Sequence, residues 1–127
     1  MYIYYNANVF GNNVEDCTIR AISVAEDISW DKAYIKLCNY ARKRGLMLNS
    51  IESIESYLDN NYDRIKVYPY ETVGEFAYDN PNGTFLVTMN GHISVIKSGH
   101  IIDTFDCSNR EILSAWYVDK YWFNIYN

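Results

Sequence analysis

A meander of three antiparallel β-strands is predicted by the stretch "GTFLVTMNGHISVIKSGHIIDTFD", which covers residues 83–106. Its three strand-like runs are separated by Asn-Gly at 90–91 and Ser-Gly at 98–99, and such residue pairs favour tight hairpin turns. The aromatic segment that follows, at 112–126, predicts one or two further strands.

The first half of the chain has the period of helices. Apolar residues recur at helical spacing over 17–27, 30–44 and about 51–60, with Ser29 able to cap the second helix and Gly45 able to end it. The remaining expectations are a strand at 2–5, an Asn- and Gly-rich loop at 6–16, a strand at 65–70 ended by Pro69, and a short helix at 72–80.

Helices that precede a sheet in a chain of 127 residues indicate one α+β domain over 1–127, with N-terminal helices packed on a C-terminal antiparallel sheet. The net charge is −5 and the largest basic cluster is "ARKR" at 41–44, so no nucleic-acid partner is expected. No apolar run approaches the ~18 residues of a membrane span, and the start does not read as a signal peptide. Three cysteines without metal-like spacing favour free thiols in the cytoplasm.

Cys17 is the first candidate for chemistry because it begins a predicted helix. The unpaired N–H groups and positive dipole end there lower the pKa of a thiol and favour the reactive thiolate. The alternative is a thiol that only packs in the core, which is the expectation for Cys38 on the apolar face of the second helix. Cys107 follows a strand and lacks the helix N-terminus. Arg20, one helical turn after Cys17, could support the thiolate or bind a carboxylate, but a structural salt bridge with Asp16 is the favoured expectation.

A thiolate nucleophile needs a base, and His92 opens a strand directly after the Asn-Gly turn. His100 lies at the other end of that hairpin, ~15 Å away, so it cannot join the same site and is expected to be an exposed turn residue. The acid that orients His92 depends on the turn. A two-residue turn puts Asp103 diagonally on the face of His92, whereas a three-residue loop with a bulge puts Asp106 directly opposite.

The order of these residues resembles the papain-like cysteine peptidases. Within them it is most similar to small phage and bacterial proteins with the pattern N-P-x-G-x4-D-C-x-x-R-A followed by G-H-x-x-x-V-x-x-G-x-x-x-D-T-W-D-S. The matching text here is "NVFGNNVEDCTIRA" and "GHISVIKSGHIIDTFDCS", and "TVGEFAYDNPNGTFLV" is similar to a third block of that family. The bacteriocin-leader peptidases are more distantly similar.

The resemblance implies a papain-like fold and a Cys-His-Asp triad. By position, Cys17 would be the nucleophile, His92 the base and Asp106 the acid that orients the imidazole, with Asp103 as the alternative third member. Phe105 stands where the family has Trp.

The loop before Cys17 would supply an oxyanion hole together with the Cys17 backbone N–H. Papain-like peptidases usually have a Gln six residues before the Cys, but that position is Gly11 here. Asn8, Asn12 and Asn13 are the amides near enough in sequence to take its place.

These features predict a thiol hydrolase that cleaves an amide or isopeptide bond in a protein or peptide substrate, with no metal or organic cofactor. Acyl transfer or deamidation would use the same groups. The resemblance implies a phage-encoded protein in the cytoplasm of a bacterial host. The alternative is a non-catalytic binding or inhibitory module on the same fold, with the aromatic tail as its contact surface. The oligomeric state is left open.

Overall fold

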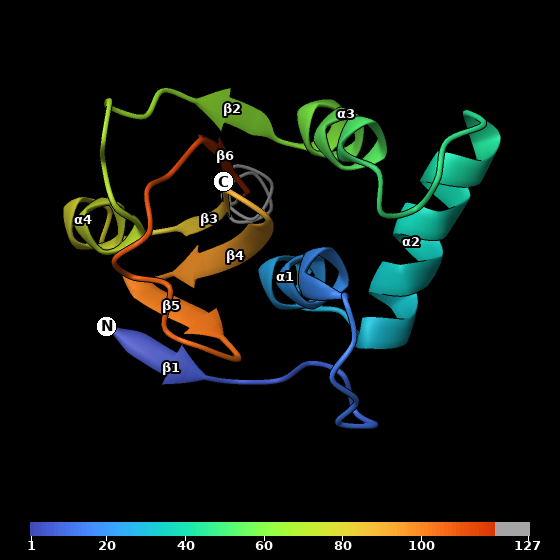
Figure 1. Cartoon of the computed structure of the whole chain (residues 1–127), viewed down its shortest axis with the longest axis horizontal. Coiled ribbons are helices and arrows are strands. Elements are labelled where there is room, and N and C mark those ends of the chain that lie inside the picture. Colours follow the sequence, from blue (N-terminus) through green and yellow to red (C-terminus); the bar gives the residue numbers. More distant parts are fainter. Residues whose placement is uncertain (119–127) are drawn as a thin grey trace, which may run out of the picture.

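The computed structural model describes residues 1–118, which form an α+β fold of four helices and six strands (Figure 1). The helices are α1 (Cys17–Glu26), α2 (Trp30–Lys43), α3 (Ile51–Asn61) and α4 (Val73–Asp79). The strands are β1 (Tyr2–Tyr4), β2 (Asp63–Ile65), β3 (Thr84–Met89), β4 (His92–Lys97), β5 (His100–Asp103) and β6 (Ser114–Tyr117).

All six strands belong to one sheet with the order β1-β5-β4-β3-β6-β2. The predicted meander is confirmed: β3, β4 and β5 are antiparallel neighbours, and Met89–His92 and Lys97–His100 are the residue pairs that flank its two-residue turns. The predicted all-antiparallel sheet is wrong at one edge, where β1 pairs with β5 in parallel. β6 is one of the strands expected after the meander, and any second strand would lie outside the described residues.

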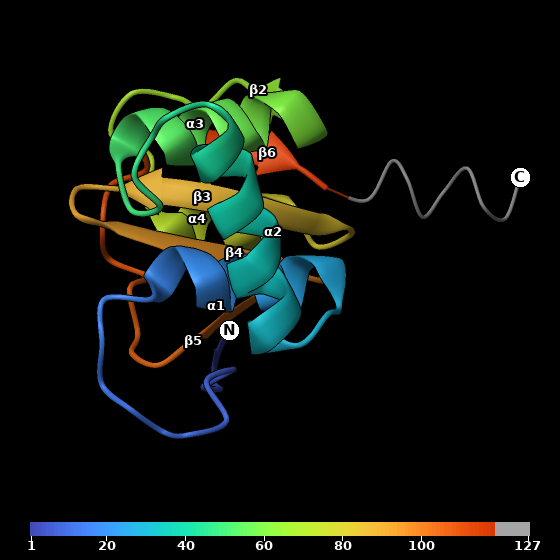
Figure 2. The same cartoon turned by 90° about the vertical axis from the view of Figure 1, so that its right-hand side faces the viewer.

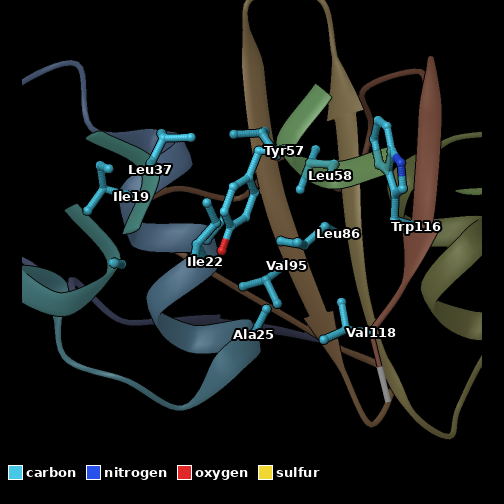
Figure 3. Close-up of a cluster of buried hydrophobic side chains, with 13 residues drawn as sticks. Ile19, Ile22, Ala25, Leu37, Tyr57, Leu58, Leu86, Val95, Trp116 and Val118 are labelled. Carbon is cyan, nitrogen blue, oxygen red and sulfur yellow. The ribbon is translucent and has the colours of Figure 1, made fainter. Parts of the chain in front are cut away.

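A hydrophobic core lies on each face of the sheet. Successive residues of β3 point to opposite sides, so that the strand contributes to both cores. Leu86 packs with residues of α1, whereas Phe85 and Val87 pack with residues of α4. Figure 1 shows these two helices on opposite faces of the sheet. The α1-side core includes Ile19, Ile22, Leu37, Tyr57, Leu58, Leu86, Val95 and Trp116 (Figure 3). The α4-side core includes Val73, Phe76, Phe85, Val87, Ile96, Ile101, Cys107 and Ala115.

Helix α1 is the element that carries the candidate nucleophile, and it lies directly against β4 and β3. Helix α2 packs on the outer side of α1, away from the sheet, and Ser29 caps it as predicted by accepting a hydrogen bond from the Lys32 N–H (Figures 1 and 2). The loop from β1 to α1 starts at the sheet end where Tyr4 pairs with Asp103. The start of α1 and that end of the sheet are therefore joined by the loop over residues 5–16.

The prediction of a strand over 65–70 is wrong in its position, because β2 covers Asp63–Ile65. Helix α3 is followed almost at once by β2, whose residues Asp63 and Ile65 pair with Tyr117 and Ala115 of β6. The chain then leaves the sheet, and its turn at Tyr70 leads into α4. Within residues 1–118, no helix is long and apolar enough to cross a membrane.

Candidate active site

Three predicted site residues meet at one end of the sheet. Cys17 is the first residue of α1, His92 the first of β4 and Asp103 the last of β5. Cys17 and Asp103 line one small pocket together with Arg20, Ser94 and Tyr5. The two secondary-structure layers thus contribute a thiol from the helix and an imidazole–carboxylate pair from the sheet.

His92 and Asp103 are in direct contact, with 2.7 Å between Nε2 and Oδ2. The same carboxylate oxygen accepts a 2.6 Å hydrogen bond from the Ser94 hydroxyl, and its other oxygen accepts one from the Thr104 N–H at 2.7 Å. The side chains of His92 and Asp103 are only 6% and 4% exposed. The acid is therefore held by several donors and sheltered from water.

The resemblance favours Asp106 as the acid beside His92, but in this structure Asp103 makes that contact. The hairpin has the two-residue turn, because Lys97 pairs with His100 and Val95 with Ile102. This register puts Asp103 diagonally on the face of His92. Asp106 lies beyond the end of β5, is exposed, and accepts a hydrogen bond from the Ser108 N–H at 3.0 Å.

The Cys17 thiol is polarised by several groups. Burial on its own raises its pKa, but a hydrogen bond with His92, another from the Ile93 N–H, and the positive charges of His92 and Arg20 outweigh burial, so the pKa is lowered. Since Nε2 of His92 is occupied by Asp103, Nδ1 is the ring nitrogen left for the sulfur. The pKa of Cys17 is lowered in the predicted direction, but the groups that lower it are His92, the Ile93 N–H and Arg20.

His92 and Asp103 are shifted toward their charged forms. Burial lowers the pKa of His92, but its hydrogen bonds with Asp103 and Cys17 and the charges of both raise it to about 9. Burial raises the pKa of Asp103, but hydrogen bonds from His92 and Ser94 lower it overall. At neutral pH these shifts favour a thiolate–imidazolium pair backed by a carboxylate.

One face of the His92 ring is covered by Phe105, with 4.7 Å between the two ring centroids. This is the neighbour expected for a two-residue turn, in which Phe105 lies opposite His92 across the hairpin. Phe105 is itself half-exposed and has the Arg110 guanidinium 6.0 Å from its centroid. The aromatic ring therefore limits the access of water to the imidazole.

The three asparagines proposed for the oxyanion hole have different surroundings. Asn8 is buried, and its amide nitrogen donates to Asp16 Oδ2 at 3.3 Å while its oxygen accepts from the Phe10 N–H at 3.0 Å. Asn12 and Asn13 are exposed. Asn8 thus holds the loop in shape, and one of its two amide hydrogens is already used.

The other candidates lie where they cannot act as the nucleophile or base. Cys38 is half-buried on α2, away from the sheet. His100 pairs with Lys97 at the opposite end of the hairpin, and it is half-buried, not exposed as predicted. Cys107 is fully buried, and burial together with the charge of Asp103 raises its pKa to about 11, so its thiol stays protonated at neutral pH.

His92, Asp103 and Cys107 have donor atoms that all lie within 4.8 Å of one another. Two ligands of a tetrahedral zinc ion would be ~3.4 Å apart, whereas His92 Nε2 and Asp103 Oδ2 are in direct hydrogen-bond contact at 2.7 Å. The Arg20 guanidinium, 3.7 Å from Asp103, also repels a cation. The arrangement is that of a hydrogen-bonded pair and not of a metal centre.

Two contributors to the site were not recognised from the sequence. Ser94 holds Asp103, and its position two residues after His92 on the same strand face was a usable signal. Trp30, at the start of α2, donates from its indole nitrogen to Asp16 at 2.9 Å, and no local pattern indicates that contact.

Comparisons of the chain with protein-family models, with curated proteins and with solved structures find no match. The α+β architecture and the geometry around Cys17 and His92 therefore stand on the structure alone.

Proposed function

We propose that the protein is a papain-like thiol hydrolase that cleaves an amide or isopeptide bond, with Cys17 as nucleophile, His92 as base and Asp103 as the residue that orients the imidazole. The observations that carry the proposal are the 2.7 Å contact between His92 and Asp103 and the lowered pKa of Cys17, to which His92 contributes. A thiolate at a helix start, beside a histidine and a carboxylate on two antiparallel strands of a mixed sheet, also has the arrangement expected for a papain-like fold.

The chemistry follows from these positions. The Cys17 thiolate attacks the carbonyl carbon, and the Cys17 N–H at the helix start is a donor available to the oxyanion. The His92 imidazolium gives its proton to the leaving amine as the C–N bond breaks, which leaves a thioester on Cys17. Neutral His92 then takes a proton from water, whose oxygen attacks the thioester and releases a carboxylic acid and the thiolate. An amine in place of water would give acyl transfer.

Thiol reactivity tests this proposal directly. An ordinary thiol of pKa ~8.5 is only about 0.3% thiolate at pH 6. We expect iodoacetamide to alkylate Cys17 at pH 6 at least about tenfold faster than Cys38, with the modified cysteine identified by peptide mass spectrometry. A peptide vinyl sulfone should label Cys17, and Cys17→Ala should abolish that labelling.

His92→Ala should remove the difference in alkylation rate between Cys17 and Cys38, because it removes the hydrogen bond and the positive charge that stabilise the thiolate. His100→Ala is the matched control, since His100 lies at the other end of the same hairpin. If folded wild-type protein alkylates Cys17 no faster than Cys38, the hydrolase proposal fails. The non-catalytic binding module is then the better explanation.

A further inference from the structure

Buried charged side chains connect α1, the helix that begins with Cys17, to Asp103, the acid that contacts His92. Arg20 lies one helical turn after Cys17, and its Nη1 donates to Asp16 Oδ1. Its Nη2 lies 3.7 Å from Asp103 Oδ1. The side chains of Arg20, Asp16 and Asp103 are 14%, 6% and 4% exposed. One guanidinium therefore stands between two buried carboxylates.

Both carboxylates are fixed by neutral donors as well. Asp16 accepts hydrogen bonds from the indole nitrogen of Trp30 at 2.9 Å and from the amide of Asn8 at 3.3 Å. Asp103 is held by Ser94 and Thr104 on the side of the sheet. Because these donors already fix the positions of the two acids, the specific contribution of Arg20 is its charge.

The position of Arg20 is also costly to maintain. Its Nε is buried and has no hydrogen-bond partner among the described residues, and an unsatisfied buried donor costs ~1–3 kcal/mol. Asp16 directly precedes Cys17, and Asp103 lies behind His92. Without Arg20, the negative charges of Asp16, which is next to Cys17 in the chain, and of Asp103, which lines the same pocket as Cys17, would both oppose a third negative charge on the sulfur.

We propose that Arg20 is a positioning residue that neutralises the buried acids Asp16 and Asp103 and thereby allows the Cys17 thiolate to form near them. The inference rests on the proposed function, since it assigns a reason for the thiolate. Arg20 of α1, Asp103 of β5 and Tyr5 after β1 line the same pocket as Cys17. His92 of β4 acts on the thiol directly, and Asp16 precedes Cys17 in the chain and pairs with Arg20.

The test is the pH midpoint of Cys17 alkylation, measured site by site in the full chain. In Arg20→Gln, the midpoint should rise by about one unit, which is about a tenfold loss of thiolate at any pH well below the midpoint. Arg110→Gln is the matched control. It removes a cation from the outer side of Phe105, where it has no contact with either acid among the described contacts, and it should shift the midpoint by less than about 0.3 units.

A second substitution separates charge from structure. Asp16→Asn keeps an oxygen for the Trp30 indole but removes the charge, so adding it to Arg20→Gln should reverse at least half of the shift. If Arg20 only held the fold together, the double variant would be no better than the single one, and that result would overturn the proposal. A folded Arg20→Gln protein with an unchanged midpoint would overturn it as well.

If Arg20→Gln does not fold, Asp16→Asn alone decides the matter. Removing that negative charge beside Cys17 while Arg20 remains should lower the midpoint, and an unchanged or higher midpoint refutes the inference. These shifts are measured relative to the wild-type midpoint, whatever its value. The hydrolase proposal is tested separately by the wild-type rate and by His92→Ala, so the two failures are distinguishable.

Discussion

His92 has two partners, Asp103 and Cys17, and both stabilise the protonated form of its imidazole. Asp103 accepts at Nε2, and the Cys17 sulfur is the neighbour on the other side. Both raise the pKa of the imidazole, which reaches about 9 in spite of burial. The thiolate–imidazolium pair is therefore the dominant form between the lowered pKa of Cys17 and pH ~9, and hydrolysis should decline as His92 loses its proton near that upper limit.

Asp103→Asn should lower the pKa of His92 from about 9 toward the ordinary value of ~6.5. The amide can still bond to the ring, but the negative charge that stabilises the imidazolium is gone. Cys17 should therefore be alkylated more slowly than in wild type at pH 8, where an imidazole of pKa ~6.5 is largely neutral and one of about 9 is still charged. NMR titration of the His92 ring protons measures the first effect, and site-resolved alkylation measures the second.

Asp106→Asn is the control for that substitution, because Asp106 is an exposed acid three residues further along that bonds to the Ser108 backbone. It should leave both the His92 titration and the Cys17 alkylation rate unchanged. If Asp106→Asn lowered the pKa of His92 and Asp103→Asn left it unchanged, Asp106 would be the acid that orients the imidazole in solution.

The sequence was sufficient to place Cys17 and His92, because a helix start and a strand start are local features. The choice of acid was not local. It depended on whether the Ser98-Gly99 turn had two or three residues, and the two-residue form requires a positive φ at Ser98, where φ is 52°. A serine adopts that conformation uncommonly, so the residues themselves did not select the register that brings Asp103 to His92.

At the scale of the elements, α4 is the helix that its composition predicts least well. It has seven residues with a glycine at the second position, and glycine costs ~1 kcal/mol in a helix relative to alanine. A capping box compensates at its start: the Thr72 hydroxyl accepts from the Glu75 N–H at 3.1 Å, and the Glu75 carboxylate accepts from the Thr72 N–H at 2.9 Å. That motif was visible in the sequence, but the reason for the glycine was not.

The reason for Gly74 is the close approach of the segment that follows β5. Its N–H donates to the Ser108 carbonyl at 2.8 Å, and a Cβ at position 74 would lie 3.1 Å from that oxygen and 3.3 Å from the Ser108 Cβ. This contact links residues 34 positions apart, so the local pattern of residues in the helix cannot predict it. The helix was predictable from its cap, whereas its tolerance for glycine comes from tertiary packing.

Gly74→Ala should therefore destabilise the protein by ~1–3 kcal/mol, even though alanine is the better helix former. The clash is with a backbone carbonyl that is itself fixed by a hydrogen bond to residue 74. Chemical denaturation measures the change in the free energy of unfolding. Tyr78→Ala on the exposed side of the same helix should change it by less than ~0.5 kcal/mol. A Gly74→Ala protein as stable as wild type would show that Ser108 can move aside.

For the whole molecule, the sheet separates two cores that have different relations to the site. The α1-side core lies between the sheet and the helix that carries Cys17, whereas the α4-side core lies behind the sheet (Figures 1 and 3). His92 and Asp103 belong to the sheet itself. Packing in the α1-side core therefore determines the distance between the sulfur and the imidazole. The α4-side core supports the sheet from behind but does not separate these two groups.

Ile22 and Ile96 test this division because they are the same residue type, are both 0% exposed, and belong to opposite cores. Truncation of either one to Ala should cost ~2–5 kcal/mol of unfolding free energy, since each leaves a cavity. Only Ile22→Ala removes packing between α1 and the sheet. In protein that is still folded, it should slow Cys17 alkylation at pH 6 several-fold, whereas Ile96→Ala should stay within about twofold of wild type. Equal effects of the two variants on Cys17 would mean that its reactivity follows global stability and not the seating of α1 on the sheet.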